Sequence, residues 1–184
     1  FVTVACGAVY QLAPVALGTT LASERYGWWH FGLHAFGVPG MVWSFWHWDL
    51  KLLSHFGFAV ALGILLFSVN TWRTVRRCER KGTVAWSLGL AAGWLLATVL
   101  AGLLLTANRY WNFIPIEPVA LLRAHAHIGL VGFFLTLLQG VGFQLVPMFT
   151  LGEVRDWRLA NAGLWLTQAG LLGLTPAFVW SIMP

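Results

Sequence analysis

The chain has 184 residues, of which 59% are hydrophobic and only 9% are charged, and its formal net charge is +5. Soluble domains carry roughly 25% charged residues, so this composition excludes a soluble globular protein and indicates an integral membrane protein. Five of the eleven basic residues gather in one short segment between two apolar runs: Arg73, Arg76, Arg77, Arg80 and Lys81. This clustering argues against nucleic-acid binding and predicts that the loop at 72–83 is cytoplasmic.

Six apolar runs predict one partial and five full membrane-spanning helices, because a span needs about 20 apolar residues. In chain order they are 1–16, 27–48, 52–71, 84–107, 119–149 and 159–182. The first run starts without a charged segment before it, so we expect a helix already under way and a chain that is a fragment of a longer protein. The predicted fold is all-α: a polytopic transmembrane helix bundle that forms a single transmembrane domain over residues 1–184.

A cytoplasmic basic loop fixes the orientation of the other loops. The loops at 15–26 and 150–158 would also be inside, and those at 48–52 and 108–118 outside, as expected for a bacterial inner (plasma) membrane. His125 and His127 then lie about 9–12 Å from the outer end of their helix, at 1.5 Å per residue. His47 and His55 fall at a similar depth.

The run at 119–149 carries the strongest candidate site, the H-x-H pair His125 and His127. Residues two apart on a helix point about 200° from each other, so the two imidazoles would serve different neighbours, as on a helix standing between two cofactors. Histidine is costly inside a membrane, and its ring nitrogen is a common ligand of iron or copper. The alternatives are hydrogen-bonded packing histidines, or a proton or copper role.

The chain also contains an internal repeat. A shift that moves Phe1 onto Phe134 superposes FVTVACGAVYQLAP at 1–14 on FLTLLQGVGFQLVP at 134–147, with six identities. The shift spans four predicted helices. It therefore predicts a protein built from four-helix pseudo-repeats with matching direction.

Three sequence segments carry a resemblance to a known family: HAHIGLVGF at 125–133, GAVYQLAP at 7–14 and SERYGWWHF at 23–31. Together they resemble subunit I of the heme-copper oxidase superfamily, closest to the cbb-type cytochrome c oxidases. The resemblance implies twelve helices in three pseudo-repeats of four, with residues 1–14 ending the sixth helix and 123–149 forming the tenth; the second and sixth helices are an alternative pairing. It also implies that His125 binds a high-spin heme iron and His127 a low-spin heme.

The function implied by this resemblance is respiratory-chain electron transfer by a subunit that binds one or two hemes b. Its partners would be the lipid bilayer and other membrane or cytochrome subunits. The adjacent His-His pair that holds copper in the family is replaced here by Gly40 and Met41. This departure puts copper, and reduction of dioxygen or nitric oxide, in question, so both an oxidoreductase and a non-catalytic relative stay open. The alternative function is a cofactor-free membrane scaffold or transporter subunit.

Several other residues are weaker candidates. Arg123 would pair with a heme propionate or with a lipid phosphate, and Arg109 has a similar role in the outer loop. His55 and His47 would be metal ligands or interfacial side chains. His30 and His34 share a helix face at i, i+4, which suits a metal ion, although packing at the membrane interface is favoured. Gln139 and Thr136 lie deeper on the same helix as the H-x-H pair and are expected to pack against neighbouring helices.

Overall fold

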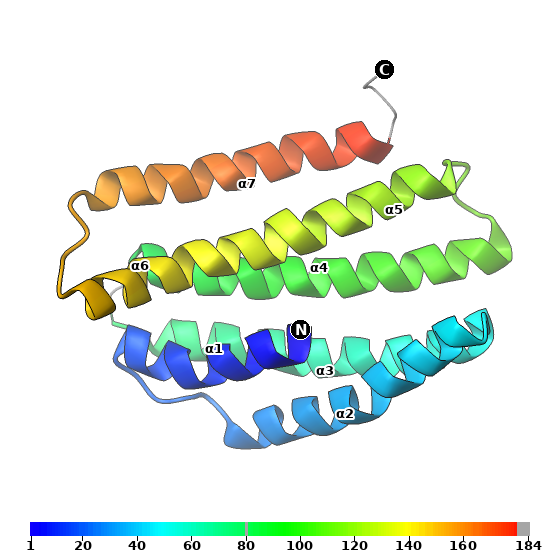
Figure 1. Ribbon diagram of the computed structural model, residues 1–184, viewed down its shortest axis with the longest axis horizontal. Helices are drawn as coiled ribbons and strands as arrows, with labels where there is room; N and C mark the ends of the chain where they lie inside the picture. Colours follow the sequence, from blue (N-terminus) through cyan, green and yellow to red (C-terminus); the bar gives the residue numbers. More distant parts are fainter. Residues whose placement is uncertain (80, 180–184) are drawn as a thin grey trace.

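The computed structural model describes residues 1–79 and 81–179, and every regular element in these ranges is a helix (Figure 1). In chain order the elements are α1 (Val2–Leu17), α2 (Glu24–Trp46), α3 (Leu50–Arg77), α4 (Thr83–Trp111), α5 (Pro118–His127), the π-helix η1 (Ile128–Leu135), α6 (Thr136–Thr150) and α7 (Trp157–Val179). Because α5, η1 and α6 follow one another without a break, the described residues form six helical rods. The all-α prediction is confirmed.

The long helices have the character of membrane spans. α3, α4 and the continuous helix Pro118–Thr150 are each long and apolar enough to cross a membrane, and α1 is a shorter apolar helix. Large apolar side chains such as Trp28, Trp46 and Leu166 are exposed on the outside. A helix in contact with a lipid bilayer needs an apolar exterior, and its backbone N–H and C=O groups must be hydrogen-bonded within the helix. The exposed apolar side chains meet the first of these requirements.

Two helices are longer at their C-terminal ends than the hydropathy pattern predicts. α3 continues to Arg77, so Arg73, Arg76 and Arg77 lie on a helix and not in the predicted loop. α4 likewise continues to Trp111 and includes Arg109, which was expected in a loop. Arginine is a good helix former, and a cation in the last turn interacts favourably with the helix dipole. The basic segment therefore extends the helix where apolarity ends.

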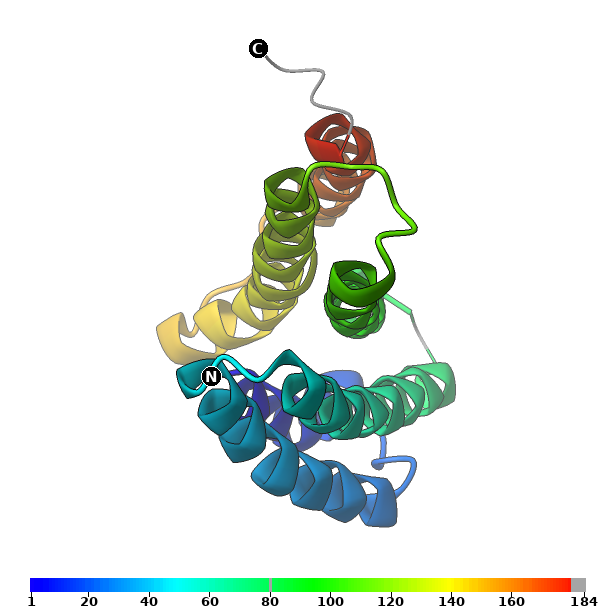
Figure 2. The ribbon, with the colours of Figure 1, turned by 90° about the vertical axis from the view of Figure 1, so that its right-hand side faces the viewer.

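The helices pack mainly in chain order, each antiparallel to the one before it (Figures 1 and 2). α2 packs on α3, α3 on α4, and α4 on η1 and α6. α7 packs mainly on the continuous helix formed by α5, η1 and α6, and it also contacts α4. α1 packs against both α3 and α4. The main hydrophobic core lies where these elements meet, and its members include Ile64, Phe67, Leu95, Phe133 and Leu137.

Glycines allow η1 and α6 to approach α4 closely. A Cβ on Gly132 would lie 2.9 Å from Cγ of Trp94, and one on Gly140 would lie 2.5 Å from Cβ of Ser87. Neither distance is compatible with a larger side chain unless a neighbour moves. Small residues at such contacts are typical of helices that associate in membranes, where close van der Waals packing replaces the hydrophobic effect.

The helices α1 and α6 end in equivalent turns, each of which leads into the next helix. α1 stops at Gly18 and α6 at Leu151, both in the left-handed conformation, with φ of 59° and 51°. In each case the next N–H donates to a proline carbonyl, at 3.0 Å to Pro14 and 3.1 Å to Pro147. The sequence shift that places Phe1 on Phe134 also places Gly18 on Leu151, so the repeated segments end in the same turn.

Candidate functional site

The H-x-H pair lies at the end of α5, a ten-residue helix with a well-defined start. Pro118 occupies its first turn, where a missing N–H costs nothing, and the Glu117 carboxylate accepts a hydrogen bond from the Ala120 N–H at 2.8 Å. From this cap the helix runs unbroken to His127. The local sequence therefore fixes where the two imidazoles lie along the rod.

His125 is half-buried and faces α4. Its Cε1 and Nδ1 atoms lie 3.2 and 3.7 Å from the position that a Cβ on Gly102 would occupy. Nδ1 is buried and makes no hydrogen bond of good geometry, although the backbone of Thr98 interacts with the ring. Gly102 thus allows the His125 ring to lie close against α4, where its Nδ1 is buried without a hydrogen bond.

His127 is also half-buried, but two residues further along the helix it points about 200° away from His125. α5 packs against both α4 and α7, and these two helices also contact each other (Figure 2). By helical spacing the two imidazoles point away from each other and therefore do not converge on one ion.

A π-helix follows the histidine pair directly, from Ile128 to Leu135. π-helical turns are rare and occur frequently at functional sites. Within this segment Gly129 lies against Thr98 and Gly132 against Trp94, so the widened turns face α4. The sequence IGLVGFFL is uniformly apolar and gives no signal that distinguishes a π-helix from an α-helix, which is why this element was not predicted.

The weaker candidates do not gather around the pair in the contacts that the structure describes. Arg123 is exposed on α5, and Arg109 is exposed in the last turn of α4. His47 is exposed, with its ring 4.3 Å from that of Trp43. His55 is exposed, and its Nδ1 lies 2.7 Å from the carbonyl oxygen of Lys51 on its own helix.

A polar network ties the π-helical region to α4 and α7. Trp94 Nε1 donates to Gln168 Oε1 at 2.6 Å, and Gln168 Nε2 donates to the Thr136 hydroxyl at 3.1 Å. Gln139 donates separately to the Thr167 hydroxyl at 3.0 Å. Thr136 and Gln139 thus pack against a neighbouring helix through hydrogen bonds, as the sequence predicts.

His30 and His34 are buried inside the bundle. Both side chains are only 2% exposed and are enclosed by α1, α2 and α3. The reason is Gly63 of α3, whose missing side chain makes room for both rings. This contact joins distant parts of the chain and leaves no local sequence signal.

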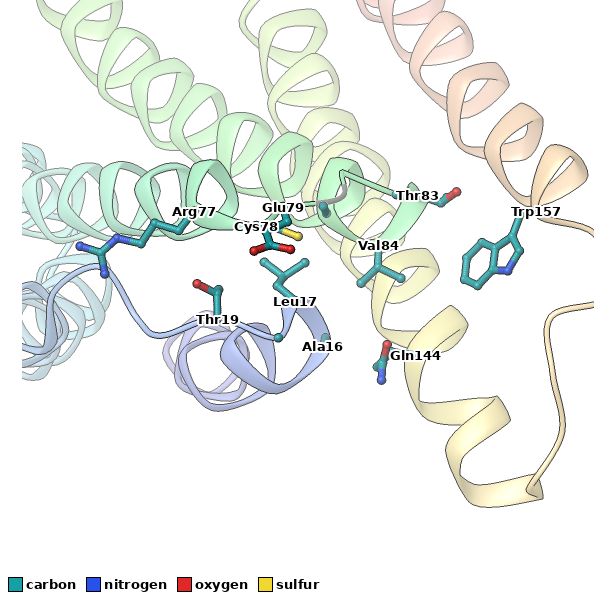
Figure 3. A pocket seen from close by; sticks show the side chains of 13 residues that line it. Ala16, Leu17, Thr19, Arg77, Cys78, Glu79, Thr83, Val84, Gln144 and Trp157 are labelled. Atoms are coloured by element: carbon teal, nitrogen blue, oxygen red, sulfur yellow. The ribbon is translucent and has the colours of Figure 1, made fainter.

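An open cavity of about 670 Å³ lies at the opposite end of the bundle from the H-x-H pair (Figure 3). It is bounded by the ends of α1 and α3 and the start of α4, with Gln144 and Trp157 on its far side. Thr19, Arg77 and Glu79 contribute polar atoms to its lining. This cavity could not be predicted from the sequence, because its walls come from five separate segments.

Among residues 1–79 and 81–179, no three side chains of the His, Cys, Asp or Glu type come together as a group that could hold a metal ion. No protein-family model matches the chain, nor does any curated protein or any solved structure.

Proposed function

We propose that this chain is a heme b-binding, electron-transferring subunit of an integral membrane complex, related to subunit I of the cbb-type cytochrome c oxidases. The observation that carries the proposal is the H-x-H pair at the end of α5, with its half-buried imidazoles directed to opposite sides of one helix. That arrangement suits axial ligands for two separate irons, since each imidazole supplies one nitrogen.

The residues around the pair fit this role. His125 has a buried Nδ1 that lacks a good hydrogen bond, and it faces a glycine. Arg123 is exposed two residues before it, where its guanidinium is free to pair with a propionate carboxylate. Bound heme would supply a one-electron iron couple. The protein would set the potential of that couple through the imidazole ligands, burial and hydrogen bonds to the ligands.

The membrane arrangement forms part of the proposal. All six rods would cross a bacterial inner membrane, with the basic end of α3 and Lys81 in the cytoplasm. The H-x-H pair would then lie toward the outer side. Lipid would cover the exposed apolar side chains, and other membrane or cytochrome subunits would cover part of the surface as electron donors or acceptors.

The test is a reduced-minus-oxidised optical spectrum of the purified full-length protein and of its His125→Ala and His127→Ala variants. We expect a heme b spectrum in the wild type that weakens in either variant, because each loses one axial nitrogen. His47→Ala and His55→Ala remove exposed imidazoles and serve as matched controls that should keep the full spectrum.

A flat difference spectrum from folded wild-type protein would refute heme binding and leave a cofactor-free membrane scaffold. A spectrum that is unchanged in both α5 variants would place the heme ligands elsewhere in the complex. Gel filtration of each variant in detergent shows whether it is folded, so loss of heme is distinguished from loss of structure.

A further inference from the structure

The buried histidines of α2 form a second candidate site, separate from the H-x-H pair. His30 and His34 are one helical turn apart, and their ring centroids are 4.3 Å from each other at an interplanar angle of 68°. Each side chain is 98% buried, as its exposed fraction of 2% shows. Burying two imidazoles this close together in an apolar bundle costs free energy unless their ring nitrogens have partners.

Only some of the ring nitrogens of His30 and His34 have a hydrogen-bond partner. Nδ1 of His34 is hydrogen-bonded to the Thr3 hydroxyl at 3.0 Å. Nε2 of His34 and Nε2 of His30 are both buried and have no hydrogen-bond partner; the Val60 backbone interacts with His34, but without hydrogen-bond geometry. If Nδ1 of His34 is the donor to Thr3, its Nε2 carries a free lone pair.

Both rings turn the same edge toward α3. Their Cδ2 atoms, which are bonded to Nε2, lie 2.9 Å (His34) and 3.4 Å (His30) from the position of a Cβ on Gly63. The two unpartnered nitrogens therefore belong to ring edges that meet at one glycine. The ring of Tyr10 also packs edge-on against His30, at 5.7 Å between centroids, and adds a buried phenol to the cluster.

Two neutral imidazoles that both present lone pairs cannot satisfy one another, and buried polar atoms without partners are costly in a membrane. A cation that accepts both lone pairs removes the cost. Imidazole pairs at i, i+4 on one helix bind transition-metal ions, and a hydrogen bond to the other ring nitrogen is the usual way to orient such a ligand. Thr3 supplies that bond here.

We propose that His30 and His34 bind a single late first-row transition-metal ion through their Nε2 atoms. Thr3 is a positioning residue for His34, and Gly63 provides the space. No Cys, Asp or Glu among the described residues joins the pair, so the ion keeps its charge. Cu⁺ is easier to bury than Zn²⁺ for this reason, while imidazole suits both metals, and both serve as probes.

The experiment loads the purified full-length protein with Cu⁺ or Zn²⁺ and measures the metal bound per chain after gel filtration. We expect one ion of at least one of the two metals in the wild type, and its loss in His30→Ala and His34→Ala. His47→Ala, His55→Ala and His125→Ala should retain it. Thr3→Val should weaken binding by roughly 10- to 100-fold, the usual effect of losing a partner of a metal ligand.

X-ray absorption spectroscopy of the loaded wild type provides a test that needs no variant to fold. We expect a first shell that contains two imidazole nitrogens. If the wild type binds neither ion, if the α2 variants bind as much as the wild type, or if imidazole is missing from the first shell, the proposal is wrong. Because His125→Ala should retain the metal, failure here is distinguishable from failure of the heme proposal.

Discussion

Gly132 is the residue at which η1 comes closest to α4. A Cβ there would lie 2.9 Å from Cγ of Trp94, whose ring is held in place by its hydrogen bond to Gln168. We expect Gly132→Ala to lower the free energy of unfolding by about 1–3 kcal/mol, the usual cost of overpacking a core. Thermal unfolding in detergent measures the effect.

Gly142 offers a matched control, because a Cβ on this α6 glycine meets nothing within 4 Å. Gly142→Ala should leave the free energy of unfolding unchanged or raise it by up to about 1 kcal/mol, since alanine is the better helix former. Equal melting temperatures for the two variants would contradict the packing described for Gly132.

Gln168 is the central residue of the network that joins α4, α6 and α7. Its side chain is 5% exposed and bonds both Trp94 and Thr136. A double-mutant cycle with Gln168→Leu and Thr136→Val should give a coupling energy of about 0.6 kcal/mol, and at most about 1.7 kcal/mol, the mean and the maximum for hydrogen bonds between membrane helices. The exposed Gln11 on α1 is the control: Gln11→Leu should show no coupling to Thr136→Val, and equal couplings would contradict the network.

At the scale of the elements, the end of α6 carries a strained residue. Leu151 has φ 51° and is 95% exposed, whereas its counterpart at the end of α1 is Gly18 with φ 59°. A left-handed conformation costs a non-glycine residue about 1–2 kcal/mol, and Leu151 buries almost nothing in return. We expect Leu151→Gly to raise the melting temperature.

The reverse substitution at the equivalent turn supplies the comparison. Gly18→Ala should lower the melting temperature, because a Cβ at φ 59° is strained even though nothing lies near it. If both substitutions shifted the melting temperature in the same direction, the two turns would not be equivalent.

The π-helix η1 sets the angle between the histidine pair and the face of α6. Removing one exposed residue, Leu130, should let the segment relax to an α-helix and turn the pair by about 100° relative to α6. If the pair ligates heme as proposed, this deletion should weaken the heme spectrum while helicity by circular dichroism is retained. An unchanged spectrum would show that the π-helix does not position the pair.

Helix identities were predictable from the sequence, but their ends and geometry were not. Runs of apolar residues predict six rods because each rod must present an apolar exterior. Hydropathy does not show that α3 continues through Arg73 to Arg77, since there the helix is favoured by arginine propensity and the helix dipole. Hydropathy does not reveal η1 either, because its residues are all apolar or glycine and the hydropathy pattern is the same for an α-helix and a π-helix.

At the scale of the whole molecule, the proposed orientation predicts which loops face the cytoplasm. In a Cys78→Ala background, a cysteine at Lys81 should react with a membrane-impermeant maleimide only after the cells are permeabilised. A cysteine at Asn112, beyond the end of α4, should react in intact cells. The opposite pattern would invert the proposed topology and place the H-x-H pair toward the cytoplasm.

The two histidine pairs differ in how much of their surroundings can be predicted from the sequence. His125 and His127 lie on opposite sides of one helix, a fact that spacing alone predicts. Whether His30 and His34 are buried depends on Gly63 and Thr3, which belong to two other helices. Only the packed molecule brings those residues together, so their position could not be inferred from the local pattern.

The heme content of the purified full-length protein is the decisive measurement for the proposal that α5 holds heme b. We expect at least one heme b per chain by the pyridine hemochromogen method, with less in His125→Ala and His127→Ala and no loss in His55→Ala. Folded wild-type protein that contains no heme would contradict the account.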